Sequence, residues 1–217
     1  MPAVPPSPSA STAPVPRVLP CADHALLLEL PGLDAVQALY AALRADPPAG
    51  VSDLVPAART LLLHLAPGAD VAAVERAVRA VRPEAGGRGA GELVRVPVVY
   101  DGADLAEVAA LAGIGPREVV RLHTGAEWTV AFGGFAPGFG YLVGGPPELT
   151  VPRRTESRTR VPAGSVGLAG EFSGIYPRSS PGGWQLIGRT GLPVWQVDRD
   201  PPALLRPGVR VRFEEAG

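Results

Sequence analysis

The sequence contains no lysine and only one cysteine, Cys21, among its 217 residues; all twenty of its basic residues are arginine. Without lysine, the chain cannot carry a Walker A phosphate loop, a Schiff-base lysine or a biotinyl-lysine. A single cysteine excludes an internal disulfide and a cysteine-cluster metal site. Three histidines lie far apart in the sequence, so we expect no metal site. Any ATP or biotin chemistry must therefore take these groups from another chain.

Long apolar runs are also missing. No stretch of about 18 apolar residues occurs, so we expect no transmembrane helix. The N-terminus lacks a basic region followed by an apolar core, which is unlike a secretory signal. We therefore expect a cytoplasmic protein. A net charge of -1 with scattered arginines argues against nucleic acid as the main partner.

Composition and periodicity predict three parts. Residues 1–20 begin with proline, serine and alanine and are predicted to be a disordered tail. Residues 21–91 are predicted to be a small α/β domain, and residues 92–217 a β-barrel domain. Strands and helices are expected in the order βαββαβ, which is that of a ferredoxin-like sandwich. They are expected at residues 25–30, 35–45, 51–56, 60–65, 71–82 and 93–100.

The second half begins with helices and continues as strands. Helices are predicted at residues 105–111 and 117–123, the first capped by Asp101 or Asp104. His123 then falls at a helix end, where we expect it to complement the helix dipole; the alternative is a titratable group at the mouth of a site. From Glu127 onward, short β-like segments separated by turn residues indicate a closed or nearly closed barrel.

Residues 132–190 differ from the rest of the chain. Glycine and proline recur every few residues, which indicates frequent turns. The segment contains six arginines and three acidic residues, so its net charge is 6 − 3 = +3, whereas that of the whole chain is -1. Such a segment suits a pocket for an anionic or planar ligand. A barrel with tight turns and solvent-facing arginines is the alternative. The arginines are Arg153, Arg154, Arg158, Arg160, Arg178 and Arg189.

This segment carries a long motif. Residues 134–142 read G-F-A-P-G-F-G-Y-L, residues 160–166 read R-V-P-A-G-S-V, and residues 180–190 read S-P-G-G-W-Q-L-I-G-R-T. These strings resemble the family of 5-oxoprolinase B subunits, which includes allophanate hydrolase subunit 1 and the sporulation kinase inhibitor of the KipI type. The resemblance extends over residues 23–213. It implies an α+β chain, with a small α/β domain followed by a cyclophilin-like β-barrel.

The resemblance also implies a function. A 5-oxoprolinase opens the lactam of 5-oxo-L-proline to L-glutamate and couples this step to ATP hydrolysis. Its B subunit is expected to work with the A and C subunits, to be inactive alone, and to leave most of the ATP binding to other chains. Two alternatives share the motif: an allophanate- or urea-processing subunit of the carboxyltransferase type, and a KipI-like binding protein that inhibits a sensor histidine kinase.

A planar lactam with one carboxylate calls for a fork-shaped cation, an aromatic wall and backbone donors. The candidate catalytic residues are Tyr141, Arg160 and Tyr176. The alternatives are that the aromatic residues are barrel core and the arginines surface residues. No histidine or acid lies near Ser165 or Ser180 in the sequence, so a Ser-His-Asp triad is not supported. The candidate substrate-binding residues are Phe135, Gly138, Arg153, Ser180, Gly183, Trp184 and Arg189.

Overall fold

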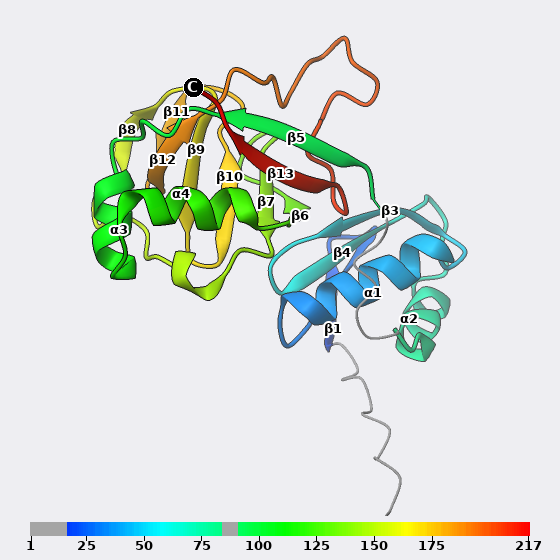
Figure 1. The fold of residues 1–217 in the computed structure, drawn as a ribbon. Helices are drawn as coiled ribbons and strands as arrows, with labels where there is room; N and C mark the ends of the chain where they lie inside the picture. The colour runs from blue at the N-terminus through cyan, green and yellow to red at the C-terminus, as the bar shows by residue number, and fades with distance from the viewer. Residues whose placement is uncertain (1–16, 84–90) are drawn as a thin grey trace, which may run out of the picture. The chain divides into compact units, whose positions relative to one another are not determined.

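A computed structural model describes residues 17–83 and 91–217 of the chain (Figure 1). It divides into two compact units, the first reaching residue 87 and the second beginning at residue 88. The first unit is a small α/β structure, and the second is built on a barrel-like sheet. The predicted mixed α+β class is confirmed. The domain boundary at residue 91 stays a prediction, since residues 84–90 lie outside the described part.

The first unit is a four-stranded antiparallel sheet with two helices. Alternation of buried and partly buried side chains along β4 gives the sheet one fully buried, apolar face. Leu61, Leu63 and Leu65 on that face pack with residues of both helices, including Val36 and Val74. In sheet order the strands are β1 (Arg17–Cys21), β2 (Ala25–Glu29), β4 (Thr60–Leu65) and β3 (Val51–Pro56). The helices are α1 (Leu33–Ala45) and α2 (Val71–Ala80).

The expected ferredoxin-like βαββαβ order is wrong in one element. Residues 93–100 were expected to form the last strand of this order, but the strand found there, β5 (Leu93–Val98), belongs to the sheet of the second unit. The edge beside β2 is filled by β1, which pairs with β2 from Arg17–Glu29 to Cys21–Ala25. Only three residues separate β1 from β2, so this hairpin closes a much shorter loop than residues 93–98 would.

The hairpin also corrects the predicted tail. Residues 17–20 were assigned to the disordered segment, yet they belong to β1, where Arg17 Nη1 lies 3.1 Å from Glu29 Oε2. Backbone hydrogen bonds to β2 order these residues despite their proline-rich surroundings. The remainder of the predicted tail, residues 1–16, lies outside the described residues.

The second unit is organised around a seven-stranded sheet that curls into a barrel. Its two edge strands, β5 and β12, are joined by a bridge in which Val99 and Arg189 exchange two backbone hydrogen bonds of 2.9 Å. This bridge nearly closes the sheet, as the sequence predicted. In sheet order the strands are β12 (Gln185–Arg189), β9 (Ser165–Ala169), β10 (Phe172–Ile175), β7 (Gly140–Val143), β6 (Trp128–Gly133), β13 (Arg210–Glu215) and β5.

Smaller elements complete this unit. A two-stranded ribbon pairs β8 (Arg158–Val161) with β11 (Ser180–Gly182), and a short 3-10 helix, η1, spans Pro147–Leu149. Helices α3 (Leu105–Ala112) and α4 (Pro116–Gly125) confirm the two predicted helices. Gly113, with φ of 68°, ends α3 in a left-handed cap. Within residues 17–83 and 91–217, no helix is long and apolar enough to cross a membrane.

Candidate functional site

Seven aromatic side chains from the motif segment gather on the barrel and form what we call the aromatic cluster. Phe132 stacks on Tyr141 with ring centroids 4.4 Å apart, and Phe139 meets Trp184 edge to face at 5.3 Å. Such edge-to-face and offset geometries stabilise aromatic pairs beyond the area they bury. The cluster consists of Phe132, Phe135, Phe139, Tyr141, Phe172, Tyr176 and Trp184.

Phe135 is the member of the cluster that solvent reaches most. Its side chain is 57% exposed, and its φ of 64° lies in the left-handed region that favours glycine. It occupies the turn between β6 and β7, and its ring meets Tyr176 edge to face at 6.0 Å. An exposed aromatic residue held in a strained conformation is a common feature of ligand-binding sites.

Tyr176 lies beneath this turn and is almost fully buried. Burial raises the pKa of its hydroxyl, against the effects of a backbone hydrogen bond from Trp184 and the charge of Arg153, which lower it. The tyrosine therefore keeps its proton at neutral pH and can donate a hydrogen bond. Gly182 is required beside it, because a Cβ there would lie 2.4 Å from the Tyr176 hydroxyl oxygen.

The arginine-rich segment runs along the ribbon of β8 and β11. Arg158 pairs in register with Gly182, and the Arg154 backbone N–H donates to the Gly183 carbonyl at 2.8 Å. A Cβ on Gly183 would meet Ser157 Oγ at 2.8 Å, so this close approach needs glycine. The ribbon thus brings the two arginines next to the glycines that border Tyr176.

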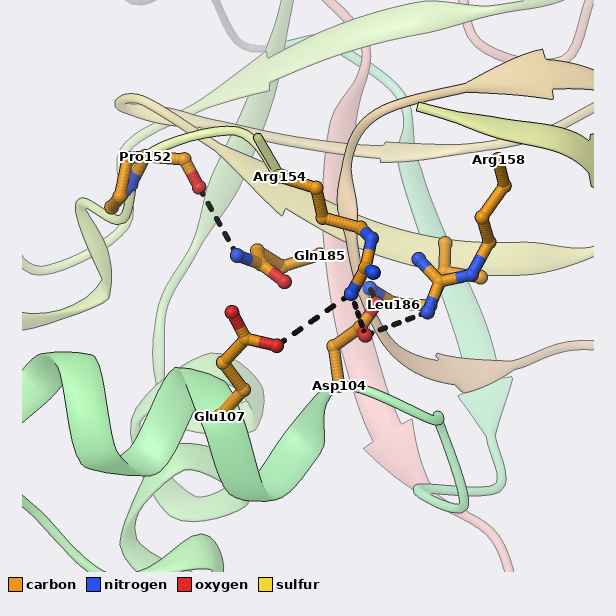
Figure 2. Close-up of polar contacts among 7 residues, drawn as sticks. All are labelled: Asp104, Glu107, Pro152, Arg154, Arg158, Gln185 and Leu186. Atoms are coloured by element: carbon orange, nitrogen blue, oxygen red, sulfur yellow. Dashed lines mark hydrogen bonds and ion pairs between the residues drawn. The ribbon is translucent and has the colours of Figure 1, made fainter. Parts of the chain in front are cut away.

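A buried carboxylate fixes these two arginines. Asp104 Oδ1 accepts from Arg154 Nη1 and from Arg158 Nη2, each at 2.7 Å (Figure 2). Asp104 Oδ2 accepts from the Leu186 backbone N–H at 2.7 Å. The carboxylate stands at the N-cap position of α3, yet it makes no capping hydrogen bond to that helix. Its acceptor capacity is directed to the barrel instead.

Asp104 is ionised in this setting. Burial acts to raise the pKa of its carboxyl group, but hydrogen bonds from Arg158 and Leu186, with the charges of Arg158 and Arg154, bring the pKa below its ordinary value. The carboxylate is 2% exposed. A buried charge of this kind is stable only while its partners are present.

The three predicted arginines lie in other surroundings. Arg160 is exposed on β8, and its Nε makes a long contact of 3.3 Å with Ser179 Oγ. Arg153 is exposed as well, although its charge acts on Tyr176. Arg189 lies at the barrel seam and pairs with Asp101 at 2.9 Å. Within the described residues, no hydrogen bond of the Arg189 side chain reaches the aromatic cluster.

The other predicted residues divide between the cluster and its supports. Phe135, Tyr141, Tyr176 and Trp184 are brought together, with Trp184 5% exposed. Ser180 lies on β11, and its buried Oγ has no hydrogen-bond partner among the described residues.

Gly138 and Gly183 are required for packing. Gly138 has φ of 83°, and a Cβ there would lie 2.6 Å from Trp195 Cβ. Gly183 allows the close approach of Ser157 described above. Their role as backbone donors to a ligand stays a prediction.

Sequence reasoning did not select Asp104, Arg154, Arg158 or Gln185 as site residues. Gln185 is 1% exposed; its Nε2 donates to the Pro152 carbonyl at 3.4 Å, and its Oε1 has no partner in the described part of the chain (Figure 2). Asp104 is 50 and 54 positions from its two arginine partners. Local spacing therefore gives no signal for this network.

His123 lies in the last turn of α4, as predicted, but its predicted role is wrong. It was expected to complement the dipole of its helix as a cation, but burial lowers its pKa to about 3, so the imidazole is neutral. Its Nδ1 lies 2.7 Å from the Tyr100 hydroxyl and its Nε2 2.9 Å from Ser173 Oγ. The ring stacks on Phe213 in the barrel core. His123 is thus a satisfied core residue.

Comparison with known proteins gives concordant results. The chain is 54% identical over 123 residues to the B subunit of 5-oxoprolinase from Escherichia coli O157:H7, covering 55% of this chain and 56% of that protein. It is 47% identical over 124 residues to the protein of the same name from Bacillus subtilis, covering 56% of this chain and 52% of that protein. The matched region thus spans about half the length of these relatives.

The fold also has a solved counterpart. The crystal structure of TTHA0988 superposes with a TM-score of 0.74 and 38% identity, over 89% of this chain and 40% of that chain. The family model described as "Carboxyltransferase domain, subdomain C and D" matches residues 16–205. These matches confirm the resemblance inferred from the motif. Because this family model covers most of the sequence, the chain belongs to the family described as carboxyltransferase domain, subdomain C and D.

Proposed function

We propose that the chain is the B subunit of a multi-subunit 5-oxoprolinase and contributes to the ATP-dependent opening of 5-oxo-L-proline to L-glutamate. The observation that carries this proposal is the 54% identity to a 5-oxoprolinase B subunit over more than half of the chain. The aromatic cluster with its neighbouring arginines supports it, because this arrangement has the chemistry that a planar, anionic lactam requires.

Each part of the site has a role in this proposal. Phe135 covers one face of the lactam ring, since it is exposed and held at a fixed angle to Tyr176. The hydroxyls of Tyr141 and Tyr176 donate to the lactam carbonyl, which makes its carbon more electrophilic. Arg153 and Arg160, both exposed, face anionic groups that a partner subunit presents.

ATP is bound mainly by another subunit in this proposal. The chain has no lysine to reach the phosphates. Its glycine-rich turn, residues 134–138, connects strand β6 to strand β7 and does not lead into a helix N-terminus, where phosphate loops bind their anion. This chain's own residues therefore bind and orient the lactam, and activation by ATP occurs with groups from elsewhere.

The partners follow from the same proposal. Homologues of the A and C subunits complete the enzyme, and the chain alone is inactive because half a site cannot hold lactam and nucleotide in reacting geometry. We place the complex in the cytoplasm and propose that the barrel is of the cyclophilin-like type.

The test is ATP-dependent release of glutamate from 5-oxoproline. The chain is assayed alone, with the A and C subunits singly, and with both, and each mixture is checked for complex formation by size-exclusion chromatography. Glutamate formed only by the full complex supports the proposal. An associated, folded complex that releases no glutamate refutes it.

A second candidate is a carboxyltransferase-type subunit that acts on urea or allophanate. The description of the matching family as a carboxyltransferase domain favours it. The same mixtures, given urea or allophanate with ATP, separate the two candidates. Turnover of these amides in place of 5-oxoproline would support the second.

A further inference from the structure

Arg154 and Arg158 carry hydrogen-bond donors that the described part of the chain does not satisfy. Arg154 Nε and Arg158 Nη1 are both buried without an acceptor. Most buried polar groups in native proteins are paired, and exceptions call for an explanation such as an absent ligand. Figure 2 shows the two guanidinium groups converging on Asp104. Two unpaired donors from adjacent guanidinium groups indicate a place for one anion.

The local charge favours an anion as well. Both guanidinium groups share Asp104 Oδ1, so two positive charges meet one negative charge there. Glu107 Oε2 lies 3.6 Å from Arg154 Nη1, but its side chain is 54% exposed. An exposed carboxylate at this distance offsets little of the excess charge. Arg153 adds a further positive charge near Tyr176.

The two arginines are held in place and lie at the border of the solvent. Asp104 is buried and receives three hydrogen bonds, so it fixes both guanidinium groups. The arginine side chains keep 28% and 24% exposure, so the pair borders solvent, and the two unpaired nitrogens lie just beneath that surface. A pre-organised pair loses less conformational entropy on binding than two mobile arginines would. Arg160 lacks such an anchor.

We propose that Arg154 and Arg158 form a binding site for a small organic carboxylate, with Asp104 as the residue that positions them. A monoanion matches the single positive charge that remains when Asp104 neutralises one of the two arginines, and the neighbouring aromatic cluster suits the apolar body of the molecule. This inference rests on the proposed function in one respect: the carboxylate is that of 5-oxoproline.

The first test uses the assembled enzyme and two lactams. One is 5-oxoproline, and the other is 2-pyrrolidinone, which is the same ring without the carboxylate. Arg158→Gln should raise the KM for 5-oxoproline by about 10- to 100-fold, the range expected for a lost charge-assisted hydrogen bond. It should leave the KM for ATP unchanged and reduce the preference for 5-oxoproline over 2-pyrrolidinone.

Two further variants define the roles. Asp104→Asn should give a smaller rise in the same KM, of about 3- to 10-fold, because the arginines remain but lose their anchor. A merely structural effect would not separate the KM for 5-oxoproline from that for ATP. Arg212→Gln, an exposed arginine on β13, is the matched control and should behave as the wild type. A raised KM for ATP with an unchanged KM for 5-oxoproline overturns the proposal in favour of a phosphate site.

A second measurement does not depend on turnover. In the full chain labelled with ¹⁵N, the side-chain Nε–H signal assigned to Arg154 should shift when 5-oxoproline is added and stay in place with 2-pyrrolidinone. A signal that moves with neither compound overturns the carboxylate site. A wild-type complex that makes no glutamate, with a shifting signal, would refute the proposed function and keep the site.

Discussion

The two units of the chain have cores of different chemistry. Within residues 17–83, the main buried cluster of the first unit consists of leucine and valine, such as Leu28, Val36 and Leu63. Among the described residues, every buried polar or charged side chain lies in the second unit. These side chains are Asp104, His123, Thr129, Ser165, Ser173 and Gln185.

This difference supports the proposal of a site in the second unit. Burying a polar group costs free energy unless each of its atoms is hydrogen-bonded, so a core that serves stability alone tends to be apolar. The first unit fits this description. The second unit carries buried polar networks beside an exposed, strained aromatic residue, which is the pattern expected where a fold holds a site at the expense of stability. Variants in each unit test this contrast.

The largest effect is expected at Asp104. Asp104→Ala leaves two partly buried arginines without their carboxylate, and breaking a buried pair in this way costs about 3–5 kcal/mol of unfolding free energy. Urea unfolding followed by tryptophan fluorescence measures it, because all three tryptophans (Trp128, Trp184 and Trp195) lie in the second unit. Asp198→Ala, which changes an exposed acid of the same unit, is the control and should cost less than about 1 kcal/mol. An equal loss of unfolding free energy in the two variants would contradict the role of Asp104 as the buried partner of the two arginines.

Cavities in the two cores should lower the free energy of unfolding by similar amounts but should affect the tryptophan emission differently. Leu63→Ala in the first unit and Leu168→Ala in the second each remove a side chain that is at most 1% exposed, which costs about 2–5 kcal/mol. Only Leu168→Ala should change the tryptophan emission of the native protein, since Leu168 pairs in register with Gln185, next to Trp184. The contrast breaks down if Leu63→Ala shifts native emission to the same extent.

The buried histidine should make stability depend on pH. Its folded pKa of about 3 lies below the ordinary value of 6.5, so the unfolded state binds an extra proton between these values. The contribution of the neutral imidazole to the free energy of unfolding is complete above pH 6.5. It is lost as the pH falls, by about 2 kcal/mol between pH 6.5 and 5. Urea unfolding at a series of pH values should show that the free energy of unfolding falls less steeply with falling pH in His123→Asn than in the wild type.

Ser173→Ala is the matched control for this slope. It removes the hydroxyl that contacts His123 Nε2 but keeps the buried imidazole. Its stability should be lower at every pH, with the slope of the wild type. If His123→Asn and the wild type have the same slope, the histidine is not the group that titrates.

The smallest effect on stability is expected at Phe135. Phe135→Gly removes the strain of the left-handed backbone, which stabilises the folded protein, but it also increases the conformational entropy of the unfolded chain. The free energy of unfolding should therefore change by no more than about 1 kcal/mol. Loss of the exposed ring should nevertheless raise the KM for 5-oxoproline by about 2- to 10-fold in the assembled enzyme. Val197→Ala, which trims an exposed apolar side chain outside the cluster, should leave this KM unchanged. An unaltered KM in Phe135→Gly would remove Phe135 from the site.

Local patterns in the sequence were sufficient for most of the secondary structure. Helices α3 and α4 follow from apolar spacing, with Pro116 at the start of α4, and β4 follows from a run of leucines. The pairing of β5 was not predictable in this way. Its alternation of buried and exposed residues fits the edge of either sheet, and its partner β13 is encoded more than 100 positions later.

The candidate site was predictable to a similar extent. The motif identified Phe135, Tyr141, Tyr176 and Trp184, which the fold brings together. It could not distinguish Arg154 and Arg158 from Arg153 and Arg160, because the four lie within eight residues of one another and the difference arises from Asp104, a distant residue. Arg153 and Arg160 were the candidates from the sequence, but Arg154 and Arg158 are the arginines that ion pairs with Asp104 hold in place.

The position of β13 has a consequence for synthesis of the protein. This strand inserts between β6 and β5, and the ion pair of Arg95 with Glu214 joins residues 119 positions apart. At a translation rate of about 5–20 residues per second, β5 waits roughly 6–24 s for its neighbour. The sheet of the first unit needs nothing beyond residue 65 and can form while the ribosome is still making the barrel. The nascent chain therefore exposes an unpaired apolar strand for seconds, and this interval is when it most needs a chaperone.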